Sequence, residues 1–134
     1  MSGVHDSALI EEGAQIGSGA GIGASCVIER GAVIRDGVRL AEHVIVRADI
    51  TVGEATTVGA GCILEGTVEI GRHCTLLPYV HLNCDGAGTR IGKDVILRDH
   101  VIVYGNVSIE NAVSVGHYTF IRPGTSLGSH NQIA

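Results

Sequence analysis

Aliphatic residues recur at every sixth position of this chain, from Val4 to Ile133. Every member of the series is Ile, Leu or Val, and the series breaks step once, between Leu82 and Ile91, where three extra residues intervene. A short, fixed period along a whole chain indicates one small structural unit that is stacked many times. The 134 residues are therefore predicted to form one repeat domain over residues 1–134.

Each repeat predicts a short strand followed by a tight corner. The residue two places before each aliphatic residue is also small or apolar, as at Ala14, Ala20 and Cys26, so both side chains point to the same side of a strand. The corner positions carry residues such as Ser18-Gly19, which suit a positive φ. Strands this short bury nothing alone, so we expect three repeats to close into a triangular coil. Coils of about 18 residues give about seven coils and a rod roughly 34 Å long at ~4.8 Å per step.

This pattern resembles the single-stranded left-handed parallel β-helix of the hexapeptide-repeat family, an all-β fold class, and the resemblance covers essentially the whole chain. The left-handed winding follows from the resemblance, because the usual crossover rule predicts the opposite hand. The opening stretch, residues 4–17, is similar to the start of UDP-N-acetylglucosamine acyltransferases. The family contains acyl- and acetyltransferases, γ-class carbonic anhydrases and proteins with no known reaction. The resemblance therefore implies the fold more specifically than the function.

Composition narrows the partners and the compartment. The net charge of −5 and the scattered Lys and Arg leave no basic stripe for nucleic acid. The sequence has no apolar run long enough to span a membrane, and its first residues lack the pattern of a signal peptide. Cys26, Cys62 and Cys74 occupy an inward repeat position and are expected to be small buried hydrophobes, whereas Cys84 falls in the interruption. We expect a cytoplasmic protein with no disulfides.

One outer face of the predicted rod carries an apolar stripe. The residues that precede the inward aliphatic residues on this face are apolar in six of seven coils, with His81 as the exception: Leu9, Val27, Ile45, Ile63, Ile102 and Phe120. The matching rows on the other two faces are mixed. An apolar row confined to one face indicates burial against a partner. We expect a homo-oligomer through this face, and the resemblance implies a trimer around a threefold axis.

Chemically distinctive residues stack at the corner that leads into the stripe, where successive coils contribute Pro78-Tyr79, Asp99-His100 and His117-Tyr118. A histidine oriented by a carboxylate can deprotonate a hydroxyl or amine as it attacks a thioester. The resemblance implies this catalytic role for His117, which holds the repeat position of the histidine that hexapeptide acyltransferases use at a subunit boundary. Tyr118 stands where those enzymes usually have Asp, so Asp99 or His100 is expected to support His117 instead.

The strands just past this corner carry the candidates for binding substrate: Arg122, Tyr104, His81 and Asn83. We expect them to collect with the histidines near one edge of the interface. Arg122 lies in a stretch, residues 121–124, similar to the Leu-Arg-Pro-Gly of the acetyltransferase domain of the bifunctional N-acetylglucosamine-1-phosphate uridyltransferase, where the arginine contacts the sugar nucleotide. Arg122 could equally pair with an acid on a neighbouring subunit. The interruption is expected to protrude as a loop over residues 83–90 and to help hold an anionic substrate.

Together with these residues, the resemblance implies an acyltransferase that moves an acyl group from a thioester to a hydroxyl or amine of a sugar or sugar nucleotide. The expected donor is acyl-CoA or acyl carrier protein, with no tightly bound cofactor and no metal. The alternative is a non-catalytic β-helix that only oligomerises. That alternative is favoured by a repeat that runs to Ala134 without the helical segment with which the transferases usually finish.

A carbonic anhydrase is the third and weakest hypothesis. Arg47-Ala48-Asp49 resembles an Arg-x-Asp stretch of the γ class, which binds Zn or Fe with three histidines. His117 matches the first of two histidines spaced His-x4-His, but the second position is Arg122. The region expected to hold the remaining histidine reads Ile63-Leu64-Glu65-Gly66, so the metal would lack its ligands.

Overall fold

The computed structural model describes residues 3–134, in which all regular structure is β-strand. Most strands are two residues long and lie on three faces of a triangular rod. The face with the apolar stripe, called the stripe face below, comprises β2 (Leu9–Ile10), β5 (Val27–Ile28), β8 (Ile45–Val46), the first half of β11 (Ile63–Ile70), the first half of β13 (His81–Ile91), β15 (Ile102–Tyr104) and β18 (Phe120–Ile121).

The other two faces follow in chain order. The second face comprises β3 (Gln15–Ile16), β6 (Val33–Ile34), β9 (Ile50–Val52), the second halves of β11 and β13, β16 (Ser108–Ile109) and β19 (Ser126–Leu127). The third face comprises β1 (Gly3–Val4), β4 (Gly21–Ile22), β7 (Arg39–Leu40), β10 (Thr57–Val58), β12 (Thr75–Leu76), β14 (Ile96–Leu97), β17 (Ser114–Val115) and β20 (Gln132–Ile133).

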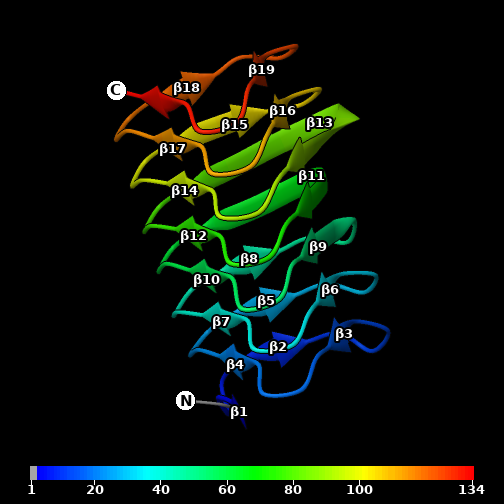
Figure 1. Cartoon of the computed structure of the whole chain (residues 1–134). Helices are drawn as coiled ribbons and strands as arrows, with labels where there is room; N and C mark the ends of the chain where they lie inside the picture. The colour runs from blue at the N-terminus through cyan, green and yellow to red at the C-terminus, as the bar shows by residue number, and fades with distance from the viewer. Residues whose placement is uncertain (1–2) are drawn as a thin grey trace.

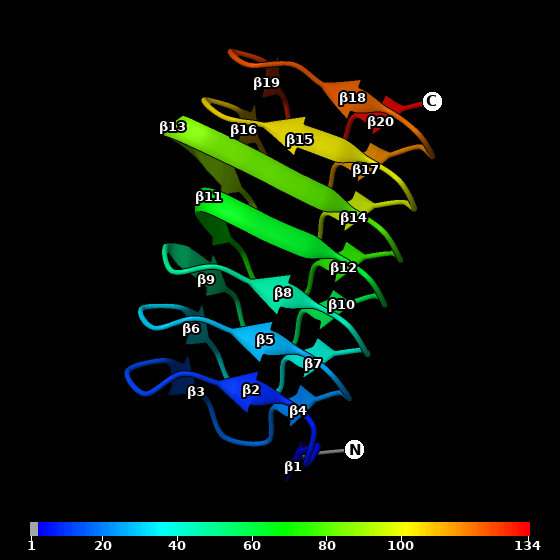
Figure 2. The ribbon, with the colours of Figure 1, turned by 180° about the vertical axis from the view of Figure 1, so that it is seen from behind.

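The coils climb from the N-terminus to the C-terminus as a left-handed solenoid (Figure 1). Seen from behind, the strands of the stripe face lie in front as one stack from β2 to β18 (Figure 2). Every pairing is parallel and joins one coil to the next, as at Leu9↔Val27. The predicted class of all-β left-handed parallel β-helix is confirmed.

The register has the expected repeat of 18 residues and one longer step. Ile63 pairs with His81 and Ile102 pairs with Phe120, each 18 residues apart. His81 pairs with Ile102, 21 residues further on, because that coil contains the three extra residues. The predicted stacking of the corner residues therefore holds on both sides of the interruption.

The core is the column of aliphatic residues that the periodicity predicts. Every member of the series from Ile22 to Ile121 is buried, with the members near the two ends partly exposed. At the smaller inward position, several Cys and Thr side chains donate to a carbonyl of the next coil. Examples are Cys62 Sγ to Leu77 O at 3.2 Å and Thr56 Oγ1 to Gly71 O at 2.9 Å. These bonds satisfy polar groups that a fully aliphatic interior would leave unpaired.

The interruption differs from the expected loop. Residues 83–90 lie within β13, which pairs along β11 with a register shift between Gly66 and Val68. The exposed part is residues 85–88, which accommodate the extra length, while Cys84 and Thr89 on either side are buried. Cys84 therefore belongs to the core, because β11 continues the sheet alongside it. Within residues 3–134, no helix is long and apolar enough to cross a membrane.

Candidate active site

The corner between the third face and the stripe face holds the residues that carry the candidate chemistry. In three consecutive coils its second residue has a positive φ: 64° at Tyr79, 63° at His100 and 59° at Tyr118. A backbone hydrogen bond links each corner to the one before it, as from Tyr118 N to Asp99 O at 3.2 Å. Equal backbone conformation at equal repeat positions places like atoms of successive coils one above another. Asp99 and His117 are thereby brought together although they are 18 residues apart in the sequence.

Asp99 is shared between two histidines. Its Oδ1 accepts a hydrogen bond from His117 Nδ1, and its Oδ2 accepts one from His100 Nδ1 at 3.2 Å. The hydrogen bond from His100, and then that from His117, hold the pKa of the Asp99 carboxyl below its ordinary value. An ionised carboxylate only accepts hydrogen bonds, so each neutral imidazole must carry its proton on Nδ1. The Nε2 of His117 is then a free base at the outer end of the ring, and the His117 side chain is 59% exposed.

His100 also lies between two tyrosine rings. The centroids of His100 and Tyr118 are 4.6 Å apart at an interplanar angle of 9°, and those of Tyr79 and His100 are 5.2 Å apart at 25°. Below this stack the corner residue is Gly61, where an added Cβ would lie 2.5 Å from Cε1 of Tyr79. The stack thus depends on a glycine at its foot. We call Tyr79, His100 and Tyr118 the aromatic ladder.

A groove of about 420 Å³ separates the aromatic ladder from the stripe. Its far wall is formed by Ile63, His81, Ile102 and Phe120, and its lining is largely apolar. Tyr118 and Phe120, on opposite sides of this groove, are 68% and 63% exposed, which is unusual for large aromatic side chains. The groove therefore offers an apolar surface beside His100, whose Nδ1 is bonded to Asp99.

His81 belongs to this groove. Its Nε2 is 3.9 Å from Oε2 of Glu65, a separation too long for a hydrogen bond. Among residues 3–134 this Nε2 is the one buried side-chain nitrogen or oxygen without a hydrogen-bond partner. The structure thus places His81 beside the aromatic ladder, with Glu65 as a neighbour that the sequence reasoning did not identify.

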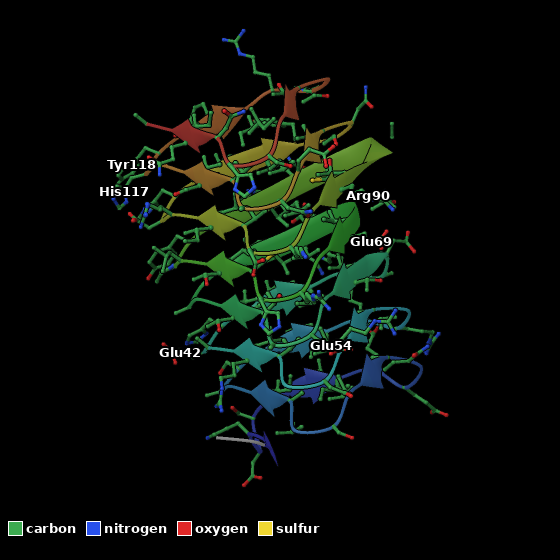
Figure 3. All side chains as sticks on the ribbon, in the orientation of Figure 1. Glu42, Glu54, Glu69, Arg90, His117 and Tyr118 are labelled. Carbon is green, nitrogen blue, oxygen red and sulfur yellow. The ribbon has the colours of Figure 1, made fainter. Side chains whose placement is uncertain are left out.

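The remaining predicted site residues lie at the other edge of the stripe face. His117 precedes β18 and Arg122 follows it, and likewise His100 precedes β15 whereas Tyr104 ends it. About four residues of strand separate the two edges, or roughly 13 Å at ~3.3 Å per residue. Figure 3 shows His117 and Tyr118 at one side of the rod, with Arg90 of the second face at the other side. Within one chain, the expectation of a single cluster at one edge is therefore wrong for Arg122, Tyr104 and Asn83.

No group of three or more His, Cys, Asp or Glu side chains converges to hold a metal ion in the described part of the chain. His81, His100 and His117 come from three successive coils but have different orientations. The aromatic ladder fixes His100, the carboxylate of Asp99 holds His117, and His81 faces Glu65.

Comparison with known proteins gives the same repeat family as the fold. The sequence profile of the bacterial transferase hexapeptide (six repeats) matches residues 7–42. Over 159 aligned positions the chain is 31% identical to the acyl-[acyl-carrier-protein]–UDP-N-acetylglucosamine O-acyltransferase of Sinorhizobium fredii, covering 93% of this chain and 59% of that protein. The chain is a hexapeptide-repeat protein.

Other relatives of this hexapeptide-repeat protein match smaller parts or the fold. It is 31% identical over 92 residues to the bifunctional protein GlmU of Alkaliphilus oremlandii, covering 69% of this chain and 19% of that protein. A crystal structure of a UDP-N-acetylglucosamine acyltransferase superposes with a TM-score of 0.60 at 20% identity, covering 98% of this chain and 61% of that one. The chain thus spans about three fifths of the length of its acyltransferase relative and a fifth of GlmU.

The corner of this hexapeptide-repeat protein can act as a base. His117 presents Nε2 to solvent, Asp99 fixes the ring through Nδ1, and the geometry is that of a histidine oriented by a carboxylate. His117 lines a shallow pocket with Arg98 and Gln132, whereas the apolar groove is lined by His100.

The sequence placed Tyr79, His100 and Tyr118 at one corner of successive coils but did not predict that their rings stack on one another. The signal for this stack was an aromatic residue or histidine at one repeat position in three consecutive coils above Gly61.

Proposed function

We propose that this hexapeptide-repeat protein transfers an acyl group from a thioester donor to a hydroxyl or amine of a sugar or sugar nucleotide. The observation that carries the proposal is the Asp99–His117 pair, in which Nδ1 of His117 is bonded to Asp99 and Nε2 is left free on an exposed side chain. The named activity of the Sinorhizobium fredii relative supports acyl carrier protein as the donor and a UDP-sugar as the acceptor. Acyl-CoA is the second candidate donor.

In the proposed reaction, His117 Nε2 removes the proton from the acceptor hydroxyl or amine as its oxygen or nitrogen attacks the thioester carbonyl. Asp99 accepts the Nδ1–H bond throughout and stabilises the imidazolium that forms. Collapse of the tetrahedral intermediate breaks the C–S bond, and the thiolate leaves with the proton that His117 returns. The products are the acylated sugar and the free thiol.

The same proposal assigns the second group of residues to a neighbouring copy. A threefold axis facing the stripe would set the histidine edge of one copy beside the opposite edge of the next, at the same height along the rod. Arg122 and Tyr104 of that neighbouring copy would then border the groove at the edge that carries His117. A guanidinium suits the diphosphate or carboxylate of an anionic acceptor. Asn83 and the segment over residues 83–90 would extend this wall.

The test is acyl transfer by the purified protein, with acyl-CoA and acyl carrier protein thioesters and a panel of sugar nucleotides. We expect His117→Ala to lower kcat by about 10²–10⁴-fold, the contribution of a positioned general base. His43→Ala is the matched control, because His43 occupies a corner of the same edge with φ 60° and follows the acidic Glu42. Failure of the wild type to transfer an acyl group from any of these thioesters would favour the non-catalytic oligomer instead.

A further inference from the structure

His100 has two sets of contacts that together restrict it more than either His117 or Asp99. Both faces of its ring are covered, by Tyr79 on one side and Tyr118 on the other. Its Nδ1 is bonded to Asp99 Oδ2 at 3.2 Å. Of these contacts, His117 has only the hydrogen bond to Asp99. The His117 side chain is also more exposed than that of His100, at 59% against 43%. The fixed member of the three is therefore His100.

The carboxylate of Asp99 is two-sided, so the orientation of one oxygen determines that of the other. A bond from His100 to Oδ2 directs Oδ1 toward His117 Nδ1. Without that bond, Asp99 would be free to rotate about its side-chain torsions at a corner where its own side chain is 30% exposed. The hydrogen bond from His100 is also the largest cause of the lowered pKa of Asp99.

Few other ionisable groups face this cluster. Tyr79 and Tyr118 flank His100 with their ring faces. Arg98 lines the same pocket as His117, together with the backbone end at Ala134. Among the described residues, neither Arg98 nor Ala134 has a hydrogen bond or ion pair to Asp99. Its side-chain partners are the two histidines, alongside a bond from its own backbone N–H.

We propose that His100 is a positioning residue: the aromatic ladder clamps its ring, and its Nδ1–H holds Asp99 so that His117 keeps its proton on Nδ1 and its Nε2 free. The proposal rests on the proposed function for its purpose, since a base at Nε2 is what acyl transfer requires. The tautomer of His117 that this role requires can be measured whether or not the protein transfers an acyl group.

Two variants of His100 separate the effect of its hydrogen-bond donor from the effect of its aromatic ring. His100→Phe keeps an aromatic ring in the ladder and has no nitrogen. His100→Asn lacks the ring but carries an amide at the place of Nδ1, and asparagine tolerates the positive φ of 63°. His43→Phe is the matched control at the same edge, where the neighbouring corner residues are Ser25 and Gly61 rather than tyrosines. Tyr118→Leu removes one side of the clamp without touching either hydrogen bond.

The readout is the ¹⁵N chemical shifts of the histidine rings at pH about 8.5, well above the ordinary imidazole pKa of about 6.5. In the wild type, His117 is expected to be protonated on Nδ1. In His100→Phe the Nδ1–H form should lose its dominance, with the proton appearing on Nε2 in at least half of the molecules. His100→Asn and His43→Phe should keep the wild-type tautomer, and Tyr118→Leu should give an intermediate population.

A His117 tautomer unchanged in His100→Phe would overturn the proposal, as would a wild type with the proton on Nε2. Loss of the Nδ1–H form in His100→Asn as well would show that the ring, and not the donor, controls Asp99. If His100→Phe does not fold, the Tyr118→Leu and His100→Asn pair still decides between these outcomes. An inactive wild type with the expected tautomers would reject the proposed function and leave the positioning role standing.

Discussion

At the scale of single residues, the structure separates thiols and hydroxyls that serve the core from groups that serve the corner. All four cysteines are unpaired and buried. Three of them, at the inward repeat position, donate to carbonyls of the next coil, as Cys62 does to Leu77 O. Asp99, by contrast, uses its oxygens on two histidines near solvent. At the inward position, small polar side chains donate to a backbone carbonyl: Cys62 uses one of the next coil, whereas Thr119 and Thr125 use one of their own corner.

The buried thiols lead to a first prediction. Burial raises the pKa of Cys62 to about 11 and raises the pKa of the other three thiols. Since the thiolate is the reactive form, none of the four should react with a disulfide reagent at pH 8 in the folded protein. All four should react after unfolding in guanidinium chloride. Rapid labelling of even one thiol in the native state would contradict the burial described here.

Asp99 leads to a second prediction, on pH dependence. Its pKa is lower in the folded protein than in the unfolded chain, so the stability that its carboxylate contributes is present above about pH 3.9 and is lost as pH falls through the folded value. Asp99→Asn should therefore lower Tm at pH 6–7, and the difference from wild type should be smaller at pH 3. A difference in Tm that is equal at both pH values would contradict a role for the charge.

At the scale of the repeat element, the residue at each corner determines which side chain can lie above it in the next coil. Two kinds of corner glycine illustrate this. Gly37 and Gly61 have nearly the same φ, 69° and 72°, but only Gly61 lies under an aromatic ring. An added Cβ at Gly37 meets nothing closer than 3.9 Å, whereas at Gly61 it would lie 2.5 Å from Tyr79.

The third prediction compares these two glycines. Gly37→Ala should cost about 1 kcal/mol for a left-handed backbone with a Cβ. Gly61→Ala should cost a further ~0.5–1.5 kcal/mol, because it displaces Tyr79 from the aromatic ladder. The free energies of unfolding from urea titrations measure both. Equal losses in the two variants would mean that the contact between Gly61 and Tyr79 is not needed for stability.

The sequence predicted most of the strand pairing because the fold is built from one short repeat. Once 18 residues make a coil, the neighbours of Ile102 and His117 follow by counting, and both Phe120 and Asp99 were found that way. Counting could not reveal the course of residues 83–90, since the pairing of β13 with β11 depends on how three extra residues are accommodated. Nor could it reveal the stack at His100, which depends on ring orientation.

At the scale of the whole molecule, the sequence placed the candidate residues in the correct coils but put Arg122, Tyr104 and Asn83 on the wrong edge of the stripe face. His117 and Arg122 are five positions apart in the chain, yet β18 lies between them and carries them to opposite sides of the stripe face. Proximity in sequence suggested one cluster. A strand is extended, however, so residues at its two ends are as far apart as the face is wide. The proposed trimer reunites them across copies.

The fourth prediction concerns the stripe as the contact between copies. Ile102→Asp with Phe120→Asp should yield monomers, because charges replace apolar side chains that would be buried between copies. Ser108→Asp with Ser126→Asp is the matched control, since these two residues also pair across the same coils but lie on the second face. Sedimentation equilibrium gives the mass of both variants. Unchanged mass in the stripe variant would reject this face as the interface.

The most direct test of the account is complementation between two inactive variants. His117→Ala and Arg122→Ala are each expected to abolish acyl transfer, and chains of the two kinds are then unfolded together and refolded as mixed trimers. If each site takes His117 from one copy and Arg122 from the next, roughly a quarter of the interfaces in an equal mixture carry both wild-type residues. Activity should recover to about that fraction of wild type. Mixed trimers that form and remain inactive would contradict a site shared between copies.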